Sequence, residues 1–535
     1  MESYDYVIVG AGSAGCCLAN RLSESGASVL LLEAGPPDVS PSIHNPAWAI
    51  SAIFSNPRVS QAYMTTPQEN LYAREIDMAR GIVRGGCSSI NGMMYVRGNR
   101  LNYRDWALRT DESWSYENVL PYFIRSENYL DGPGSPYRGR GGLMDVQPVP
   151  DPSRVSYAFI RTCRDNGFPM SNPYFDYNGE TQAEAATLYD VTVTRDGYRA
   201  SNAVAFLDSI RNRQSLTVRT GQRASSLLLD RGRAVGVEVR DGHDTHVYHA
   251  EEEIILCGGS LESPKLLMLS GIGPADHLKQ MGVEVHHDLP GVGANLEDHL
   301  MLPMYVIANP ASRPGVSDYL AEAALFTSTS GSDDVPPDLQ YLFSAGIPEL
   351  GLNPYYQPSF IFNPIMLQPE SRGTVRLRSA DPVDHPVLDP NYLAEQADVD
   401  VLVSGVQLAM DLLNQDPLST FWSGEPVFAI PNLMDPYSRM AVPKGLDELR
   451  EFVRMNATTV WHPSCTCRMG NDSDGESVVD PELRVRGIEN LRIADGSVLP
   501  RITSGNTNAP ITMIAERAAD LILGKSIEPR LAEAS

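Results

Sequence analysis

The sequence predicts a protein of the mixed α/β (α+β) class, in which a parallel-sheet domain is assembled from separated segments and a mainly antiparallel-sheet domain is inserted between them. Three observations support this prediction. A strand pattern, a glycine-rich turn, a helix pattern and a second strand pattern follow one another within residues 5–33. Alternating side chains typical of antiparallel strands occupy residues 215–239. Strand and helix patterns return at the carboxyl end, over residues 491–495 and 511–523.

The first of these segments contains the pattern G-x-G-x-x-G between two strands. A short apolar strand, Asp5–Val9, is followed by the glycines and then by a helix pattern. Gly10 permits a tight turn, Gly12 lets backbone N–H groups approach a pyrophosphate, and Gly15 lets the helix pack on the strand. Glu33 closes the second strand, where its carboxylate can bind the ribose hydroxyls of an adenosine. The segment therefore predicts a dinucleotide-binding unit.

The alternative for this segment is a glycine-rich turn that only packs a helix against a strand. The flanking strands and the acidic residue favour the dinucleotide interpretation. The carboxylate of Glu33 would repel a 2′-phosphate, which argues against NADP but does not separate NAD from FAD.

The rest of the chain does not continue as a βαβ array and shows no internal repeat, so we expect a discontinuous nucleotide-binding domain. A polar turn at residues 230–233 separates two strand patterns, and residues 253–257 resemble a buried strand. The expected segments of the first domain are residues 1–150, 206–304 and 456–535, and those of the inserted domain are residues 151–205 and 305–455.

Composition and charge disfavour several classes of function. The chain has 535 residues, 42% of them hydrophobic, and a formal net charge of −25. This balance disfavours binding to a nucleic-acid backbone or to an anionic membrane surface. No apolar run reaches the roughly 18 residues that a membrane-spanning helix needs. The first residues also lack the pattern of a secretory signal, so we expect a cytoplasmic protein.

The seven cysteines are odd in number and scattered, which is not the pattern of a disulfide framework. Cys465 and Cys467 are spaced neither as a zinc knuckle nor as a Cys-x-x-Cys motif. We therefore expect most of the cysteines to be small buried residues, and we predict no metal site.

Several further segments, taken together with the amino-terminal turn, resemble the glucose–methanol–choline (GMC) oxidoreductase family. They are residues 80–98, 259–273, 290–299, 461–470, 480–484, 495–497 and 506–508. These segments follow the family's order over nearly the whole chain, and residues 305–450 resemble the family least. The resemblance implies a Rossmann-like FAD-binding domain with an inserted, mainly antiparallel-sheet substrate domain.

The resemblance also implies which residues bind FAD. They are Gly10, Gly12, Ser13, Ala14, Gly15, Glu33, Ala34, Gly85, Gly86, Asn91, Gly92, Met93, Met94, Ala224, Trp461, Asp495 and Asn508. In some relatives a histidine just before the asparagine of the flavin-contacting loop bonds covalently to the flavin. Here that position is Ile90, which implies non-covalent FAD. The same loop departs from the family pattern at Ile82, Arg84 and Cys87.

The electron acceptor is expected to be oxygen or a quinone-like molecule. A reductase that uses NAD(P)H often carries a second nucleotide fingerprint, and the sequence contains none. Residues 271–273 and 291–296 lack both a third glycine and a clear strand–helix context.

A catalytic pair is implied at the carboxyl end. Removal of hydride from an alcohol requires a base for the hydroxyl proton, and histidine suits this role near neutral pH. His462 lies in the segment Trp461–Pro463, which resembles the family's catalytic histidine segment. The family's partner residue is expected 44 residues later, at Asn506, whose amide can hold the alcohol oxygen. The alternative is that both side chains only hydrogen-bond structural loops, and His299 is a weaker candidate for the base.

The expected function is FAD-dependent oxidation of a primary alcohol, a small molecule, to an aldehyde. One alternative is a non-redox flavin-containing lyase of the same family, acting on cyanohydrins as hydroxynitrile lyases do. Another is a nucleotide-binding module without chemistry. Residues 359–364 are expected in the sheet of the inserted domain, with alternate side chains on opposite faces. The sequence selects neither the face that meets substrate, nor the particular alcohol, nor the oligomeric state.

Overall fold

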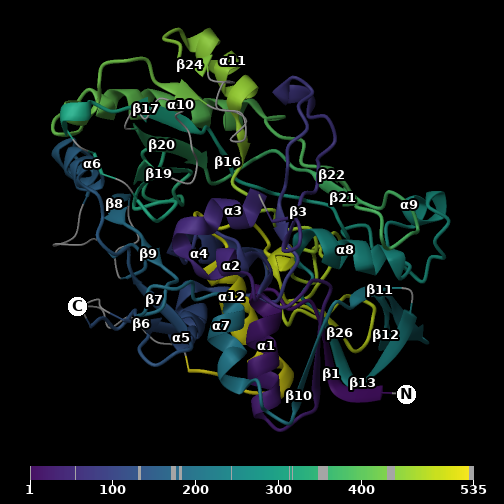
Figure 1. The fold of residues 1–535 in the computed structure, drawn as a ribbon. Coiled ribbons are helices and arrows are strands. Elements are labelled where there is room, and N and C mark those ends of the chain that lie inside the picture. Colours follow the sequence, from purple (N-terminus) through teal and green to yellow (C-terminus); the bar gives the residue numbers. More distant parts are fainter. Residues whose placement is uncertain are drawn as a thin grey trace.

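The fold contains two large β-sheets and confirms the mixed α/β class. The computed structural model describes residues 2–54, 56–130, 134–169, 176–179, 184–242, 244–312, 314–315, 317–346, 359–429 and 440–528. The strands of one sheet lie at the lower right of Figure 1, and those of the other lie at the top. In the described part of the chain, no helix is long and apolar enough to cross a membrane.

The first sheet has a parallel core. Its strands, in spatial order, are β10 (Leu216–Thr220), β2 (Val29–Glu33), β1 (Glu2–Val9), β13 (Asp244–Leu256) and β26 (Leu491–Ile493). Each neighbouring pair runs parallel. Because parallel neighbours need crossover connections, this sheet brings together strands from distant parts of the chain.

An antiparallel extension is attached to the same sheet. β11 (Arg223–Asp230) pairs with β12 (Arg233–Asp241), which pairs with the first half of β13. The predicted turn at residues 230–233 joins β11 to β12. The expectation that all of residues 215–239 pairs in antiparallel fashion is wrong, because β10 pairs in parallel with β2. Alternation of apolar and polar side chains indicates which face of a strand is buried, but it does not indicate whether the strand pairs in a parallel or an antiparallel direction.

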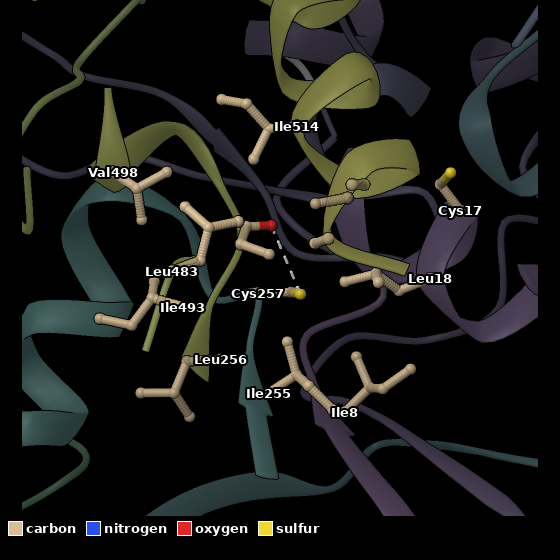
Figure 2. Packing of buried hydrophobic residues seen from close by; sticks show 14 of the residues in the cluster. Ile8, Cys17, Leu18, Ile255, Leu256, Cys257, Leu483, Ile493, Val498 and Ile514 are labelled. Atoms are coloured by element: carbon tan, nitrogen blue, oxygen red, sulfur yellow. Dashed lines mark hydrogen bonds between the residues drawn. The ribbon is translucent and has the colours of Figure 1, made fainter. Parts of the chain in front are cut away.

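Helices α1 (Ser13–Glu24) and α12 (Asn508–Leu523) pack against each other beside the parallel sheet (Figure 1). Figure 2 shows part of this core, where Ile8 of β1 and Ile255 of β13 lie near Leu18 of α1 and Ile514 projects from α12, whereas Ile493 of β26 lies on the opposite face of the sheet. All five side chains are fully buried. Burial of each such side chain stabilises the fold by about 1.5–3 kcal/mol. This core fixes the amino end of α1, and with it the glycine turn, on the sheet.

The second sheet is antiparallel, as the sequence predicted. It contains β24 (Met440–Ala441), β23 (Phe428–Ala429), β17 (Met304–Ile307), β20 (Ser359–Met366), β19 (Leu339–Ala345), β18 (Ala323–Thr327) and β8 (Ala185–Leu188), with β16 (Leu300–Met301) joining β20 to β25 (Thr458–Thr459).

The two faces of this sheet have different neighbours. On one face, Phe343 and Phe362 pack against Phe159 of α6 (Arg154–Asp165), and α10 (Gln396–Leu413) lies against β20. The alternate residues of β20 lie on the opposite face. That second face borders the cavity described below.

A smaller sheet contains β5 (Met94–Tyr95), β9 (Asp190–Val191), β7 (Met144–Pro148) and β6 (Glu127–Tyr129). This sheet combines residues from both sides of the domain border that was expected at position 150. β16 and β25 lie close to the borders that were expected near residues 304 and 456. The five-segment division of the chain into domains stays a prediction.

Other helices and strands of the described residues connect these sheets. They are α2 (Pro41–His44), α3 (Ala49–Phe54), α4 (Arg100–Arg109), α5 (Tyr116–Ser126), α7 (Asn202–Phe206), α8 (Gly259–Leu269), α9 (Ala275–Gln280), α11 (Leu446–Asn456), β3 (Ser60–Gln61), β4 (Arg80–Gly81), β14 (Ile272–Gly273), β15 (His287–Asp288), β21 (Thr374–Arg376) and β22 (Val387–Asp389).

Candidate active site

A cavity of about 320 Å³ is lined by residues of both large sheets. One wall is formed by the glycine turn, the loop after β4 and the start of α8. A second wall is formed by β16, β17, β19 and β20, and residues 460–463 and 506–508 also line the cavity. The cavity is therefore continuous from the expected dinucleotide turn to the expected catalytic pair.

The glycine turn has the geometry that bound phosphate groups require. A Cβ atom on Gly15 would lie 1.9 Å from the carbonyl oxygen of Gly10, so only glycine lets α1 approach the turn this closely. Gly10 itself has a φ of +105°, which favours glycine. At Gly12 a Cβ atom would meet nothing nearer than the Cys257 carbonyl oxygen, at 3.9 Å, so the backbone there borders open space. α1 begins at Ser13, so its N–H groups face the cavity.

Glu33 lines the cavity and also holds the turn. Its carboxylate accepts hydrogen bonds from the backbone N–H groups of Ala11, at 2.9 Å, and Gly35, at 2.8 Å. Burial raises the pKa of Glu33 to about 7, against these hydrogen bonds, which lower it. The expected contact with a ribose is therefore only one role of this side chain; the sequence did not reveal that it also supports the glycine turn.

Of the expected cofactor-binding residues, fifteen line the cavity and two do not. The fifteen are Gly10, Gly12, Ser13, Ala14, Glu33, Ala34, Gly86, Asn91, Gly92, Met93, Met94, Ala224, Trp461, Asp495 and Asn508. Gly15 lies behind the turn. Gly85, with a φ of +94°, immediately precedes the short 3-10 helix Gly86–Ser89. Arg80, Arg223 and Glu262 also line the cavity, and sequence reasoning gave them no role, although Arg80 and Glu262 lie in the family-like segments 80–98 and 259–273.

The backbone at His462 is held by a buried acidic residue. Asp298 accepts hydrogen bonds from the His462 N–H, at 2.8 Å, and from the hydroxyl group of Thr459, at 2.6 Å. The same threonine oxygen accepts the Trp461 N–H at 2.7 Å, and Trp461 has a φ of +62°, which is rare for a bulky residue. The Arg80 guanidinium donates to the Trp461 carbonyl. Sequence reasoning found the segment around Asp298 but not this role.

The ring nitrogens of His462 are assigned by a chain of three hydrogen-bonding groups. The Leu367 carbonyl lies 3.0 Å from His299 Nε2, and a carbonyl oxygen only accepts, so His299 Nε2 carries a proton. Burial lowers the pKa of His299 to about 3, which keeps the ring neutral and leaves its Nδ1 unprotonated. His462 Nδ1 lies 3.0 Å from that nitrogen and must donate.

The remaining nitrogen of His462 is therefore free to accept a proton. Burial, above all, together with electrostatic interactions with His299 and Arg80, lowers the pKa of His462 well below its ordinary value, so the ring is neutral and Nε2 keeps its lone pair. Asn506 Nδ2 lies 3.4 Å from this nitrogen, and Asn506 Oδ1 is buried without a partner among the described residues. The structure thus brings the expected pair together in the cavity.

Two further predicted residues, the alternative base His299 and the expected FAD-binding residue Asn508, lie away from this pair. His299 is fully buried behind His462 and does not line the cavity. Asn508 lies near the glycine turn, with its Nδ2 3.5 Å from Ser13 Oγ and 3.3 Å from Asn202 Oδ1.

Comparison with known proteins assigns the chain to a family. Two family models described as GMC oxidoreductase match it, one over residues 4–301 and the other over residues 369–515. The protein therefore belongs to the GMC oxidoreductase family.

The relatives include dehydrogenases and oxidases. Human mitochondrial choline dehydrogenase is 38% identical over 557 residues, which cover 98% of this chain and 90% of the relative. The alcohol dehydrogenase [acceptor] of Pseudomonas putida is 35% identical over 553 residues, covering 98% and 96%. The crystal structure of pyridoxine 4-oxidase from Mesorbium loti has a TM-score of 0.85 at 30% identity, covering 96% and 98%.

The residues of this chain fit FAD, the cofactor that the family assignment supports. Gly12 leaves room beside the backbone, α1 points its amino end at that space, and the same cavity reaches His462 and Asn506. Two solved structures of formate oxidase are 25% identical, with TM-scores of 0.86 and 0.84, and cover 98% of this chain; one is a variant made to study FAD modification. Ile90 lines the cavity and belongs to a buried apolar cluster.

Proposed function

We propose that this GMC oxidoreductase oxidises a primary alcohol to an aldehyde with non-covalently bound FAD, and that His462 is the general base. One observation carries the proposal: His462 lines a cavity that is continuous with the dinucleotide turn, and its Nε2, assigned above as the unprotonated nitrogen, lies 3.4 Å from the amide nitrogen of Asn506. The names of the relatives, which are choline and alcohol dehydrogenases, support the reaction class.

The division of labour follows from the two side chains. Bound FAD supplies the acceptor for the hydride that leaves the alcohol carbon. His462 Nε2 takes the hydroxyl proton, so that a neutral aldehyde and not a protonated carbonyl is formed. Asn506 Nδ2 donates a hydrogen bond to the alcohol oxygen, which orients it and stabilises the negative charge that develops there. Asp298 and Thr459 hold the backbone of His462, so the base keeps its position during turnover.

The non-covalent attachment rests on Ile90, which offers no nucleophile at the position where some members of the family carry a histidine. Precipitation of the holoenzyme with acid should release intact FAD into the supernatant. Flavin that stays with the precipitated chain would contradict this part of the proposal.

The electrons leave, in this proposal, to oxygen or to a quinone-like acceptor. Parallel assays of hydrogen peroxide formation and of reduction of an artificial quinone, with one alcohol, separate the two. A requirement for added NAD⁺ in turnover would overturn both.

Anaerobic mixing of the holoenzyme with a panel of primary alcohols tests the whole proposal. A substrate should bleach the oxidised flavin spectrum and yield one aldehyde per flavin. The matched control is His462→Ala, which should bind FAD but bleach far more slowly. Cleavage of a cyanohydrin without bleaching, combined with no bleaching by any alcohol, would favour the lyase alternative instead.

A further inference from the structure

We infer that the substrate is a neutral alcohol with an apolar body, and that a quaternary ammonium alcohol such as choline is excluded by charge. This inference rests on the proposed function and names its substrate class. It differs from what the names of several relatives suggest, since those enzymes are choline dehydrogenases. The argument comes from the wall of the cavity that β16, β17, β19 and β20 form beside the catalytic pair.

This substrate wall is one face of the antiparallel sheet. It is formed by Met301, Tyr305, Gln340, Leu342, Ile361, Asn363 and Ile365, all of which line the cavity. Cross-strand register makes these side chains direct neighbours: Ile365 lies between Met301 and Gln340, Leu342 is paired with Asn363, and Tyr305 with Ile361. Trp461, next to His462, packs against the buried cluster to which the apolar members of the wall belong. The wall therefore adjoins the base.

The wall offers hydrogen bonds but carries no charge. Asn363 uses its Oδ1 to accept the Met304 N–H at 2.8 Å, and its Nδ2 has no partner among the described residues. The side-chain amide nitrogen of Gln340 donates to the Tyr189 hydroxyl group, which leaves the side-chain oxygen of Gln340 available to accept a hydrogen bond. The remaining side chains of the wall are apolar, apart from the hydroxyl group of Tyr305. A neutral body with one polar substituent matches this surface.

The carboxylates that do line the cavity are engaged elsewhere. Among the described lining residues they are Glu33, Glu262 and Asp495. Glu33 accepts two backbone N–H groups, as described above. Glu262 lies within ion-pair distance of Arg223 and Lys265, at 3.7 and 3.4 Å.

Asp495 is satisfied in the same way, on the cofactor side of the cavity. It accepts hydrogen bonds from the Gly259 N–H, at 2.8 Å, from the Ser263 hydroxyl group, at 2.6 Å, and from Ser497. Arg80 also lines the cavity, and its charge lowers the pKa of His462, so its field opposes a second cation near the base.

A permanent cation in this cavity would lose its hydration without gaining a counter-charge. A cage of aromatic faces is the other way in which proteins hold quaternary ammonium groups. Among the described residues Tyr305 of the wall and Trp461 beside the base are the aromatic side chains there, and no carboxylate that is free of other partners accompanies them, so a complete cage for a cation is not formed. Charge, and not size, should therefore decide between two alcohols of the same shape.

Choline and 3,3-dimethylbutan-1-ol provide that pair, because they differ only in a quaternary nitrogen that replaces a quaternary carbon. Anaerobic flavin reduction by the holoenzyme should have a second-order rate constant at least about 100-fold higher for the neutral alcohol. Perturbation of the oxidised flavin spectrum by the non-reactive pair tetramethylammonium and tert-butanol gives a binding readout that needs no turnover, and only tert-butanol should produce it.

The variant Asn363→Asp sharpens the test, because it adds one negative charge to the wall without changing its shape. The carboxylate can still accept the Met304 N–H. The ratio of the rate constants, choline over 3,3-dimethylbutan-1-ol, should rise about tenfold or more in this variant. The control is Asn471→Asp, a partly exposed loop position outside the cavity whose side chain also accepts a backbone hydrogen bond, and the ratio should stay unchanged there.

The outcomes separate this inference from the proposed function. If choline reduces the wild-type flavin as fast as its neutral isostere, or tetramethylammonium binds as well as tert-butanol, the inference is wrong while the proposed function stands. If no alcohol of the wider panel reduces the flavin, the proposed function fails, and the inference with it. A folding failure of Asn363→Asp leaves the wild-type comparison decisive.

Discussion

The two walls of the cavity are built in different ways. The cofactor wall is mostly backbone: glycines 10, 12 and 15 shape it, and Glu33 supports it through two backbone N–H groups. The catalytic wall is made of side chains, and His462 depends there on Asp298, His299 and Leu367, which lie 95–164 residues away in the sequence. The first wall is set by a local pattern, whereas the second is set by tertiary contacts.

This difference predicts how each wall fails. Changes on the catalytic wall should alter rates and their pH dependence while FAD stays bound. Changes on the cofactor wall should alter FAD affinity or the stability of the fold. The predictions below are ordered from the largest expected effect to the smallest.

The largest effect is expected on the catalytic wall. His462→Ala should slow anaerobic flavin reduction by roughly 10²–10⁴-fold, the usual contribution of a positioned general base. FAD binding should be retained, because the glycine turn is untouched. Stopped-flow absorbance measures the rate, and flavin content per chain controls for cofactor loss. An unchanged rate would remove His462 from the mechanism.

A smaller effect on the rate of flavin reduction is expected at His299, which lies behind His462. His299→Leu removes the acceptor that fixes the proton on His462 Nδ1, and flavin reduction should slow by up to about 10²-fold through misplacement of the base. His299→Gln restores an acceptor and should recover part of the rate. A purely structural role for His299 predicts equal defects in both variants and the wild-type pH profile in each.

On the cofactor wall, Glu33→Ala should weaken FAD binding by about 1.5–3 kcal/mol for each charged hydrogen bond that is lost. Glu33→Gln keeps the shape but offers one acceptor oxygen, so its loss should be smaller. Titration of apoprotein with FAD, followed by quenching of flavin fluorescence, measures both. If the two variants bind FAD like the wild type, Glu33 supports neither the ribose nor the turn.

Two neighbouring glycines should separate stability from binding. Gly15→Ala places a methyl group against the Gly10 carbonyl and should lower the free energy of unfolding of the apoprotein by about 1–3 kcal/mol. In Gly12→Ala the added methyl group meets only the Cys257 carbonyl oxygen, at an ordinary 3.9 Å, so the apoprotein should keep its stability within about 0.5 kcal/mol while FAD binding weakens. Denaturant unfolding and FAD titration of both variants would show the opposite pattern if the assignment of the two glycines were reversed.

The same contrast explains what the sequence could predict. The strand–turn–helix unit at residues 5–33 carries its function in local spacing, so its strands, its helix and the placement of its glycines were readable from the chain alone. His462 and Asn506 were found only through resemblance to a family. Asp298 and Thr459 were missed as supports of the base, because their hydrogen bonds to its backbone exist only after β16 and β25 pair.

The substrate wall shows the same limit. Alternation in residues 359–364 predicted a strand with two faces, and the structure selects Ile361, Asn363 and Ile365 as the cavity face. The phenylalanines of β20 were equally apolar by sequence, yet they pack against the helix-covered side. Which face meets the cavity depends on the partner strands and on the helices that cover the sheet.

The central claim, that His462 Nε2 accepts the substrate proton, is tested most directly by the pH dependence of anaerobic flavin reduction. Burial lowers the pKa of His462, so the wild-type rate should be constant at neutral pH and should fall only as the pH drops through a value below about 6.5, the ordinary value for histidine. His462→Ala should be slow at every pH and should lack this inflection, whereas Asn506→Ala should be slower than wild type but keep it. A His462→Ala enzyme that reduces its flavin at the wild-type rate, with the wild-type pH profile, would contradict the account.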